Sequence, residues 1–180
     1  MIAAVVLAAG EGRRFGGTKQ LHPVAGRPML EVVLATLAGA FAGERVVVLG
    51  ARAETILDRV DLHGARPVIC ERWADGQGAS LHAGLAALGA GTEWALVVLG
   101  DGPFLDPAAV ERIAAAASAG DDRIAAADYG AGRSHPVLIP RGRWDEIPSS
   151  GDAPVRGLGA ELVDCRDLAT PGDVDYAASP

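Results

Sequence analysis

Short apolar runs alternate with segments of helical periodicity through the first two thirds of this chain. Continuous apolar runs closed by a turn are typical of strands buried on both faces of a parallel sheet. Four such runs occupy residues 2–7, 44–49, 67–70 and 94–99. Helices are predicted over residues 28–40, 54–60, 80–88 and 107–117, the last with Asp106 as its N-cap. Four strand–helix units predict an α/β fold with a Rossmann-like, doubly wound, mostly parallel sheet.

The last third of the chain has a different rhythm. Short strands are predicted over residues 124–128, 136–139 and 161–163, without regular helices between them, and residues 148–159 are predicted to form a loop. No linker or internal repeat interrupts the chain. We therefore expect residues 1–180 to form a single domain, in which the irregular C-terminal third covers a substrate cleft.

Composition excludes several classes of protein. With 180 residues, 49% of them hydrophobic, the chain is long enough to bury a core without disulfides or a structural metal. A net charge of −7 argues against general nucleic-acid binding, but it does not exclude a small anionic ligand. The two cysteines, the lack of a signal-peptide pattern and the short apolar runs predict a cytoplasmic protein that binds no membrane.

The loop after the first predicted strand is rich in glycine and cationic residues. Glycines allow close approach of the backbone to a ligand, successive N–H groups form an anion-binding nest, and cations strengthen it. In open α/β sheets, ligands bind at the carboxyl ends of the strands, where this loop begins. The sequence thus predicts a phosphate site, although a solvated surface turn remains the alternative. The residues concerned are Gly10, Gly12, Arg13, Arg14, Gly16, Gly17 and Lys19.

Two familiar phosphate-binding motifs almost fit this loop. A Walker A motif would require Gly-Lys after the spacing that separates Gly12 from Gly17, but here Thr18 precedes Lys19. A dinucleotide-binding motif would start at Gly10 and Gly12, but its third glycine, Gly16, comes one residue late. Neither motif is therefore predicted.

The same loop resembles the opening signature of the MobA-like nucleoside-triphosphate transferases, and within them it is most similar to molybdenum cofactor cytidylyltransferases. The resemblance implies a fold of the nucleotide-diphospho-sugar transferase type. It also implies that the backbone of Leu7, Ala8, Ala9 and Gly10 holds the base and ribose, and that Arg14 and Lys19 bind the triphosphate. The matching residues are Leu7, Ala8, Ala9, Gly10, Arg14, Gly16, Lys19, Gln20, Leu21, Pro23, Gly26 and Pro28.

Two further segments resemble motifs of this family. Residues 73–81 resemble a motif beside the nucleotide, in which Gly76 and Gly78 would let the chain pass close to the base. Ser80 would either cap the next helix or bond to the nucleotide. Asp101, at the end of the fourth predicted strand, resembles the carboxylate of a third motif. A hard oxygen ligand there suits Mg²⁺, although a simple turn residue is the alternative. Gly102 departs from the family, which often has glutamine there.

The C-terminal third carries weaker resemblances. Residues 134–138 resemble a segment on the acceptor side, so His135 would contact the acceptor or simply pack. Residues 151–156 resemble a loop of the acceptor pocket, which makes Asp152 an acceptor-binding candidate. Residues 167–173 resemble an Asp-x-Asp-Thr-Pro-x-Asp segment in which Ala169 replaces the middle aspartate. Asp167 is therefore the candidate for a second metal ligand, with water as a substitute.

The resemblance implies a nucleotidyltransferase. An acceptor phosphate would attack the α-phosphorus of a nucleoside triphosphate and release pyrophosphate, with Lys19, Arg14 and Asp101 as catalytic residues and Mg²⁺ as the cofactor. Ala9 favours CTP over GTP, because guanylyl-transferring relatives tend to have glycine there. The implied acceptor carries a phosphate and is a molybdopterin in the most similar members.

Three alternatives stay open. One is a nucleotidyltransferase of the same fold that acts on a sugar phosphate or another small phosphate. The second is a non-catalytic nucleotide-binding accessory protein, suggested by Ala169 and Gly102. The third is a nicotinamide oxidoreductase, which the late Gly16 and the adjacent arginines disfavour.

Overall fold

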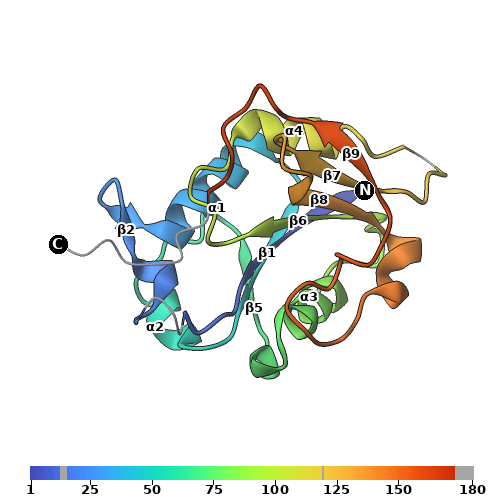
Figure 1. The fold of residues 1–180 in the computed structure, drawn as a ribbon. Helices are drawn as coiled ribbons and strands as arrows, with labels where there is room; N and C mark the ends of the chain where they lie inside the picture. The colour runs from blue at the N-terminus through green and yellow to red at the C-terminus, as the bar shows by residue number, and fades with distance from the viewer. Residues whose placement is uncertain (13–15, 119, 173–180) are drawn as a thin grey trace.

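The computed structural model describes residues 1–12, 16–118 and 120–172, and these form a single α/β domain around one seven-stranded sheet (Figure 1). The strands are β1 (Ile2–Ala8), β4 (Glu44–Leu49), β5 (Arg66–Ile69), β6 (Trp94–Leu99), β7 (Ile124–Asp128), β8 (Arg133–Pro140) and β9 (Ala160–Asp164). Their spatial order is β5-β4-β1-β6-β8-β7-β9. The predicted fold class and all seven predicted strands are confirmed, with bounds that differ by a few residues.

The sheet is mostly parallel, and β8 is the strand that runs the other way. β1, β4, β5 and β6 pair in parallel, whereas β8 pairs antiparallel with both β6 and β7. The reversal follows from chain length, because residues 129–132 are too few for the crossover that a parallel connection requires. The carboxylate of Asp128 accepts from the N–H groups of Gly130 and Gly132 and stabilises this turn.

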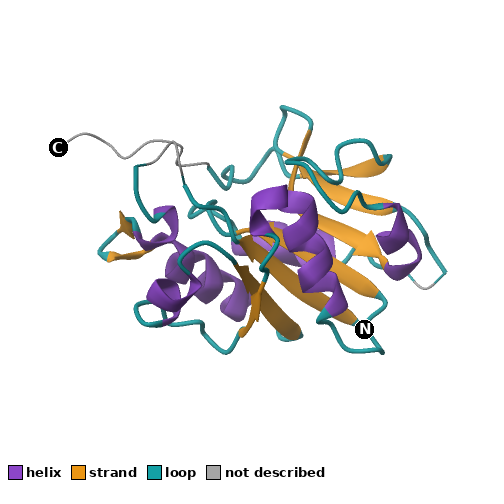
Figure 2. Ribbon diagram, turned by 90° about the horizontal axis from the view of Figure 1, so that it is seen from below, coloured by secondary structure: helices purple, strands orange, loops and turns teal. Residues whose placement is uncertain are grey.

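Helices cover both faces of the sheet. α1 (Met29–Ala40), α2 (Ala53–Leu57) and α4 (Pro107–Ala114) pack on one face, and α3 (Gln77–Ala86) packs on the other, across β1 and β4 (Figures 1 and 2). Successive side chains of a strand point to opposite faces. Val6 accordingly joins the core with α1 and α4, while Val5 joins the core with α3.

The predicted N-terminus of α4 is confirmed. The Asp106 side chain accepts a hydrogen bond from the N–H of Ala108, and Pro107 occupies the first turn. Short elements escaped prediction, because they have too few residues to show periodicity. These are the 3₁₀ turns η2 (Lys19–Leu21), η3 (Trp73–Asp75) and η4 (Arg141–Glu146), and a hairpin of β2 (Pro23–Val24) with β3 (Arg27–Pro28). Within the described residues, no helix has the length and apolar character needed to span a bilayer.

The strand order places a topological switch point between β1 and β6. From β1 the chain builds β4 and then β5 on one side, and it then returns to lay β6 on the other side of β1. In open α/β sheets, ligands bind in the crevice at the carboxyl ends of the strands where the order reverses in this way. Leu7 lies opposite Leu99 in the register, so both strands reach this edge together.

Candidate functional site

A cavity of about 620 Å³ opens at the switch point between β1 and β6. This volume is in the usual range for small-molecule sites. Ten lining residues had been predicted as site residues: Leu7, Ala8, Ala9, Gly10, Gly12, Lys19, Gly76, Ser80, Asp101 and Asp152. Seven had not: Glu11, Gln20, Trp73, Ala74, Gln77, Leu99 and Gly100.

Lys19 and Asp101 meet at this cavity. The Lys19 Nζ donates to Asp101 Oδ2 at 2.9 Å, although the two residues are 82 positions apart in the sequence. Lys19 belongs to η2, beyond the glycine loop, and Asp101 is the second residue after the end of β6. The Lys19 side chain is 13% exposed and that of Asp101 is 39% exposed, so the carboxylate is the more accessible partner. A cation and a carboxylate thus share the mouth of the crevice, as the ends of β1 and β6 predicted.

Arg13, Arg14 and Asp173 lie outside the described residues. The predicted roles of Arg13 and Arg14 in binding phosphates, and of Arg14 in catalysis, therefore stay predictions.

Gly76 and Gly78 make room for a loop of the protein itself. A Cβ on Gly78 would lie 2.5 Å from the carbonyl oxygen of Pro148, and one on Gly76 would lie 2.8 Å from the backbone of Gly151. The Gly78 N–H donates to Gly151 O, and the Gly151 N–H donates to Asp75 O, both at 2.9 Å. The two glycines were predicted to let the chain pass close to the base. In the structure they let residues 148–151 approach α3, and Asp152, which follows, lines the cavity.

Ser80 does not cap α3, contrary to one of its two predicted roles. The helix begins at Gln77, one turn earlier, and its N-cap is Gly76. Ser80 is instead 3% exposed, inside the helix, and lines the cavity. The first turn of the helix also contacts residues 148–151 through Gly78.

His135 packs beside the tip of β6. A Cβ on Gly102 would lie 2.7 Å from His135 Nε2, so the imidazole fills the space that a larger residue would need. The Tyr129 hydroxyl donates to the His135 carbonyl at 3.3 Å, and burial raises the pKa of that hydroxyl. His135 is not one of the described residues that line the cavity. Gly102, where the resembling family often has glutamine, is thus explained by the histidine next to it.

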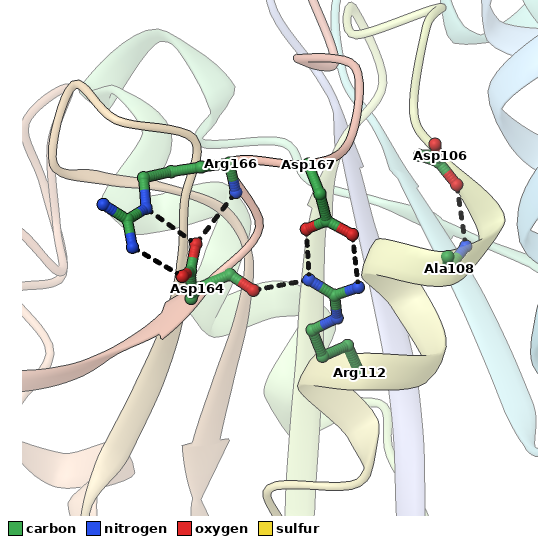
Figure 3. A network of polar contacts seen from close by, with 6 residues as sticks. All are labelled: Asp106, Ala108, Arg112, Asp164, Arg166 and Asp167. Atoms are coloured by element: carbon green, nitrogen blue, oxygen red, sulfur yellow. Dashed lines mark hydrogen bonds and ion pairs between the residues drawn. The ribbon is translucent and has the colours of Figure 1, made fainter.

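Asp167 is held by an arginine. Both of its carboxylate oxygens accept from Arg112, at 2.7 and 3.0 Å, and Arg112 also donates to the Asp164 carbonyl (Figure 3). The hydrogen bonds from Arg112 hold the pKa of Asp167 below its ordinary value. A guanidinium thus engages both oxygens of this carboxylate, and Asp167 is not among the described residues that line the cavity. The role of Asp167 as a second metal ligand therefore stays a prediction.

The donor set of the cavity suits a divalent ion that arrives with its own ligands. Carboxylates of Glu11, Asp101 and Asp152 line it, but the described residues include no group of three His, Cys, Asp or Glu that could enclose a metal. Mg²⁺ in phosphate sites usually takes one or two carboxylates and completes its shell with phosphate oxygens and water. The Asp101 carboxylate already binds one cationic group, the Lys19 ammonium. The residues therefore fit a metal–polyphosphate complex.

A family model described as a MobA-like NTP transferase domain matches residues 4–165. Among curated proteins, the chain is 35% identical to a nicotine blue oxidoreductase of Paenarthrobacter nicotinovorans, over 97% of this chain and 92% of that protein. It is also 32% identical to the bifunctional protein GlmU of Dinoroseobacter shibae, over 96% of this chain. The chain spans about a third of that relative, 36% of its length.

Solved structures share the whole fold. A nucleotidyl transferase from Methanothermobacter superposes with a TM-score of 0.82 at 25% identity, and the match covers 98% of this chain and 92% of that one. The protein Rv0371c of Mycobacterium tuberculosis, solved in complex with manganese, gives a TM-score of 0.75 at 27% identity, with 91% and 88% covered.

Proposed function

Because this chain belongs to the MobA-like NTP transferase domain family, we propose that it is a nucleotidyltransferase that moves a nucleoside monophosphate from a nucleoside triphosphate to a phosphate-bearing acceptor. The observation that carries the proposal is the meeting of Lys19 and Asp101 at the switch-point cavity. A cation for phosphates and a carboxylate for a divalent ion are the two groups that such a transfer requires.

In the proposed reaction, an oxygen of the acceptor phosphate attacks the α-phosphorus of the triphosphate in line. The new oxygen–phosphorus bond forms as the bond to the β-phosphate oxygen breaks, and pyrophosphate leaves with that electron pair. A phosphate acceptor is already ionised near neutral pH, so no general base is needed. Catalysis is then mostly a matter of positioning and of stabilising charge.

The residues of the cavity divide these tasks. Lys19 turns from Asp101 to the phosphates and stabilises the charge that develops on the α-phosphate and on pyrophosphate. The N–H groups of the loop from Gly10 to Gly12 add fixed dipoles that need no reorganisation. Asp101 would hold Mg²⁺, which supplies positive charge between the phosphates when bound.

The finer assignment concerns the two substrates. We take CTP as the favoured nucleotide, because Ala9 matches the Leu-Ala-Ala-Gly run of cytidylyltransferases, and a molybdopterin as the favoured acceptor by the same resemblance. Asp152, carried to the cavity by the loop that docks on Gly78, is the candidate for acceptor contacts. His135, which packs against Gly102 next to Asp101, is the second candidate for acceptor contacts.

A second candidate is an oxidoreductase. One observation favours it: the relative named nicotine blue oxidoreductase matches almost the full length of both chains. The same cavity would then hold a nicotinamide dinucleotide, and Lys19 would bind its pyrophosphate. This alternative gives the carboxylate of Asp101 no task, whereas the transferase uses both members of the pair.

A screen for pyrophosphate release tests the proposal. CTP, GTP, ATP and UTP are each combined with molybdopterin and with small sugar phosphates, in the presence of Mg²⁺. We expect release that requires one nucleotide, one acceptor and the metal, and that Asp101→Asn abolishes without unfolding the protein. Oxidation of NADH or NADPH by nicotine blue is followed in parallel. Reduction of nicotine blue without any release of pyrophosphate would refute the proposed function and support the second candidate.

A further inference from the structure

Four successive carbonyl groups at the end of β1 are all engaged. The Leu7 oxygen accepts from Gly100 N–H at 2.9 Å, and the Ala9 oxygen accepts from Ala51 N–H at 3.1 Å. Both donors come from the ends of neighbouring strands. The carbonyl oxygens of Ala8 and Gly10 have a different partner, a side chain of η2.

That side chain is Gln20. Its Nε2 donates to both the Ala8 and the Gly10 carbonyl oxygens, each at 2.8 Å, so both amide hydrogens are used. Gln20 is 7% exposed, and its Oε1 is buried without a hydrogen-bond partner in the structure. An unpaired buried acceptor costs about 1–3 kcal/mol. Stability alone therefore does not account for a glutamine at this position.

The same short turn, η2, fixes the backbone positions of both Gln20 and Lys19. Hydrogen bonds from Leu21 N–H to Thr18 O and from His22 N–H to Lys19 O, at 2.9 and 3.0 Å, define η2. Gly12 lies against this turn, because a Cβ on Gly12 would lie 3.2 Å from the Lys19 Cβ. The position of the loop backbone and that of the ammonium are thus linked through η2.

From this arrangement we infer that Gln20 is a positioning residue for polyphosphate binding. Carbonyl oxygens carry partial negative charge and repel phosphate, whereas N–H groups attract it. The Gln20 amide hydrogen-bonds the carbonyl oxygens of Ala8 and Gly10 and so keeps them from facing an anion. The backbone N–H groups of this segment are then the polar groups available to bind phosphate. The inference rests on the proposed function, since it assumes that a polyphosphate enters this cavity.

Tripolyphosphate is the probe, because it has the charge of the substrate without base or ribose. Calorimetry with excess Mg²⁺ compares the wild type with Gln20→Met, which keeps the size of the side chain and removes both donors. We expect tripolyphosphate affinity to fall about tenfold, as for the loss of one hydrogen-bonded contact to a charged group. Should Gln20→Met not fold, Gln20→Leu also removes both donors and adds no charge.

Arg45→Met is the matched control. Arg45 also bridges backbone carbonyls, donating to those of Phe41, Gly43 and His63, but it lies at the amino end of β4, remote from the cavity. Both variants are expected to lower Tm, while tripolyphosphate affinity at a temperature well below both Tm values falls only in Gln20→Met. A lower Tm with wild-type affinity in Gln20→Met would assign Gln20 a purely structural role and overturn the inference. If the wild type binds neither tripolyphosphate nor any of the four nucleotides, the proposed function fails first.

Discussion

Lys19 and Asp101 form an ion pair at the cavity, and this has consequences for how metal and substrate bind. A divalent ion that approaches Asp101 alone must compete with an ammonium at 2.9 Å. A polyphosphate offers that ammonium other partners and brings oxygen ligands for the metal. Metal and nucleotide should therefore bind cooperatively, each favouring the other by the same factor.

Lys19 is the only lysine in the sequence, so reductive ¹³C-methylation labels it and the N-terminal amine alone. We expect the Lys19 methyl resonance to shift with CTP and Mg²⁺ together and to move little with Mg²⁺ alone.

In unlabelled protein, Lys19→Met should lower turnover by about 10²–10³, as for the loss of one preorganised donor. The same variant should bind Mn²⁺ more tightly than the wild type in the absence of nucleotide. Weaker Mn²⁺ binding would mean that the ammonium does not compete with the metal.

The contact between Gly102 and His135 gives a second prediction at this scale. Gly102→Ala places a methyl 2.7 Å from His135 Nε2, and overpacking of this kind costs about 1–3 kcal/mol in the free energy of unfolding. Adding His135→Ala should restore most of that loss, as measured by denaturant unfolding of both single variants and the double variant. Additive losses would show that the two residues do not share this space.

The residue-scale outcome shows what the sequence can and cannot predict. Lys19 and Asp101 were predictable, because each follows a strand whose end defines the crevice. The role of Gln20 was not, because its two partners are backbone oxygens 10 and 12 positions earlier in the sequence, which become its neighbours only in the folded chain. The engagement of Asp167 by Arg112 was equally hidden, since it joins α4 to a segment 55 residues later.

At the scale of elements, the site depends on loops that dock on the sheet scaffold. Residues 148–151 lie on Gly76 and Gly78, and His82 of α3 contacts the Ile147 carbonyl at 2.7 Å. These contacts hold in place a segment without regular structure, and the next residue along it, Asp152, lines the cavity. The predicted loop was correct in type, but its position required knowledge of which glycines it meets.

Gly78→Ala tests this docking. Its Cβ would meet backbone atoms of Pro148 and Ser150 at 2.5–2.7 Å, so the loop must shift and take Asp152 with it. We expect the KM for the acceptor to rise severalfold, while calorimetry shows tripolyphosphate affinity close to that of the wild type. Gly157→Ala is the control, because a Cβ there has no heavy atom within 4 Å in the structure. An unchanged acceptor KM in Gly78→Ala would show that the position of residues 148–152 does not affect acceptor binding.

The ion pair of Arg112 and Asp167 secures the segment that follows β9. This segment reaches the loop after β6, where the Phe104 N–H donates to the Pro171 carbonyl at 2.9 Å. The pKa of Asp167 is lowered in the folded protein, so the contribution of the pair is present above the ordinary value of 3.8 and is lost as the pH falls through the folded value. Asp167→Asn should therefore speed hydrogen exchange at Phe104 at pH 6, and the difference from wild type should vanish in acid. Both side chains are partly exposed, so the effect is local rather than global. A difference that persisted in acid would assign it to packing instead of charge.

At the scale of the whole molecule, function follows from strand order. The return of the chain from β5 to β6 across β1 opens the crevice, and the carboxyl ends of both strands deliver their loops to it. The alternation of apolar runs and helices was sufficient to predict that the first four strands of the sheet are parallel, but it did not predict their order. The reversed direction of β8 was not predicted, because it depends on the length of one turn rather than on periodicity.

The central claim is that this crevice binds a nucleoside triphosphate with its divalent ion between Lys19 and Asp101. Crystals grown with Mn²⁺ and an α,β-methylene analogue of CTP, which cannot react, test it directly through the anomalous signal of manganese. The account predicts a manganese peak at coordination distance from Asp101, with the triphosphate against Lys19 and the loop that Gln20 holds. A nucleotide seated elsewhere, or a manganese ion that does not touch Asp101, would contradict it.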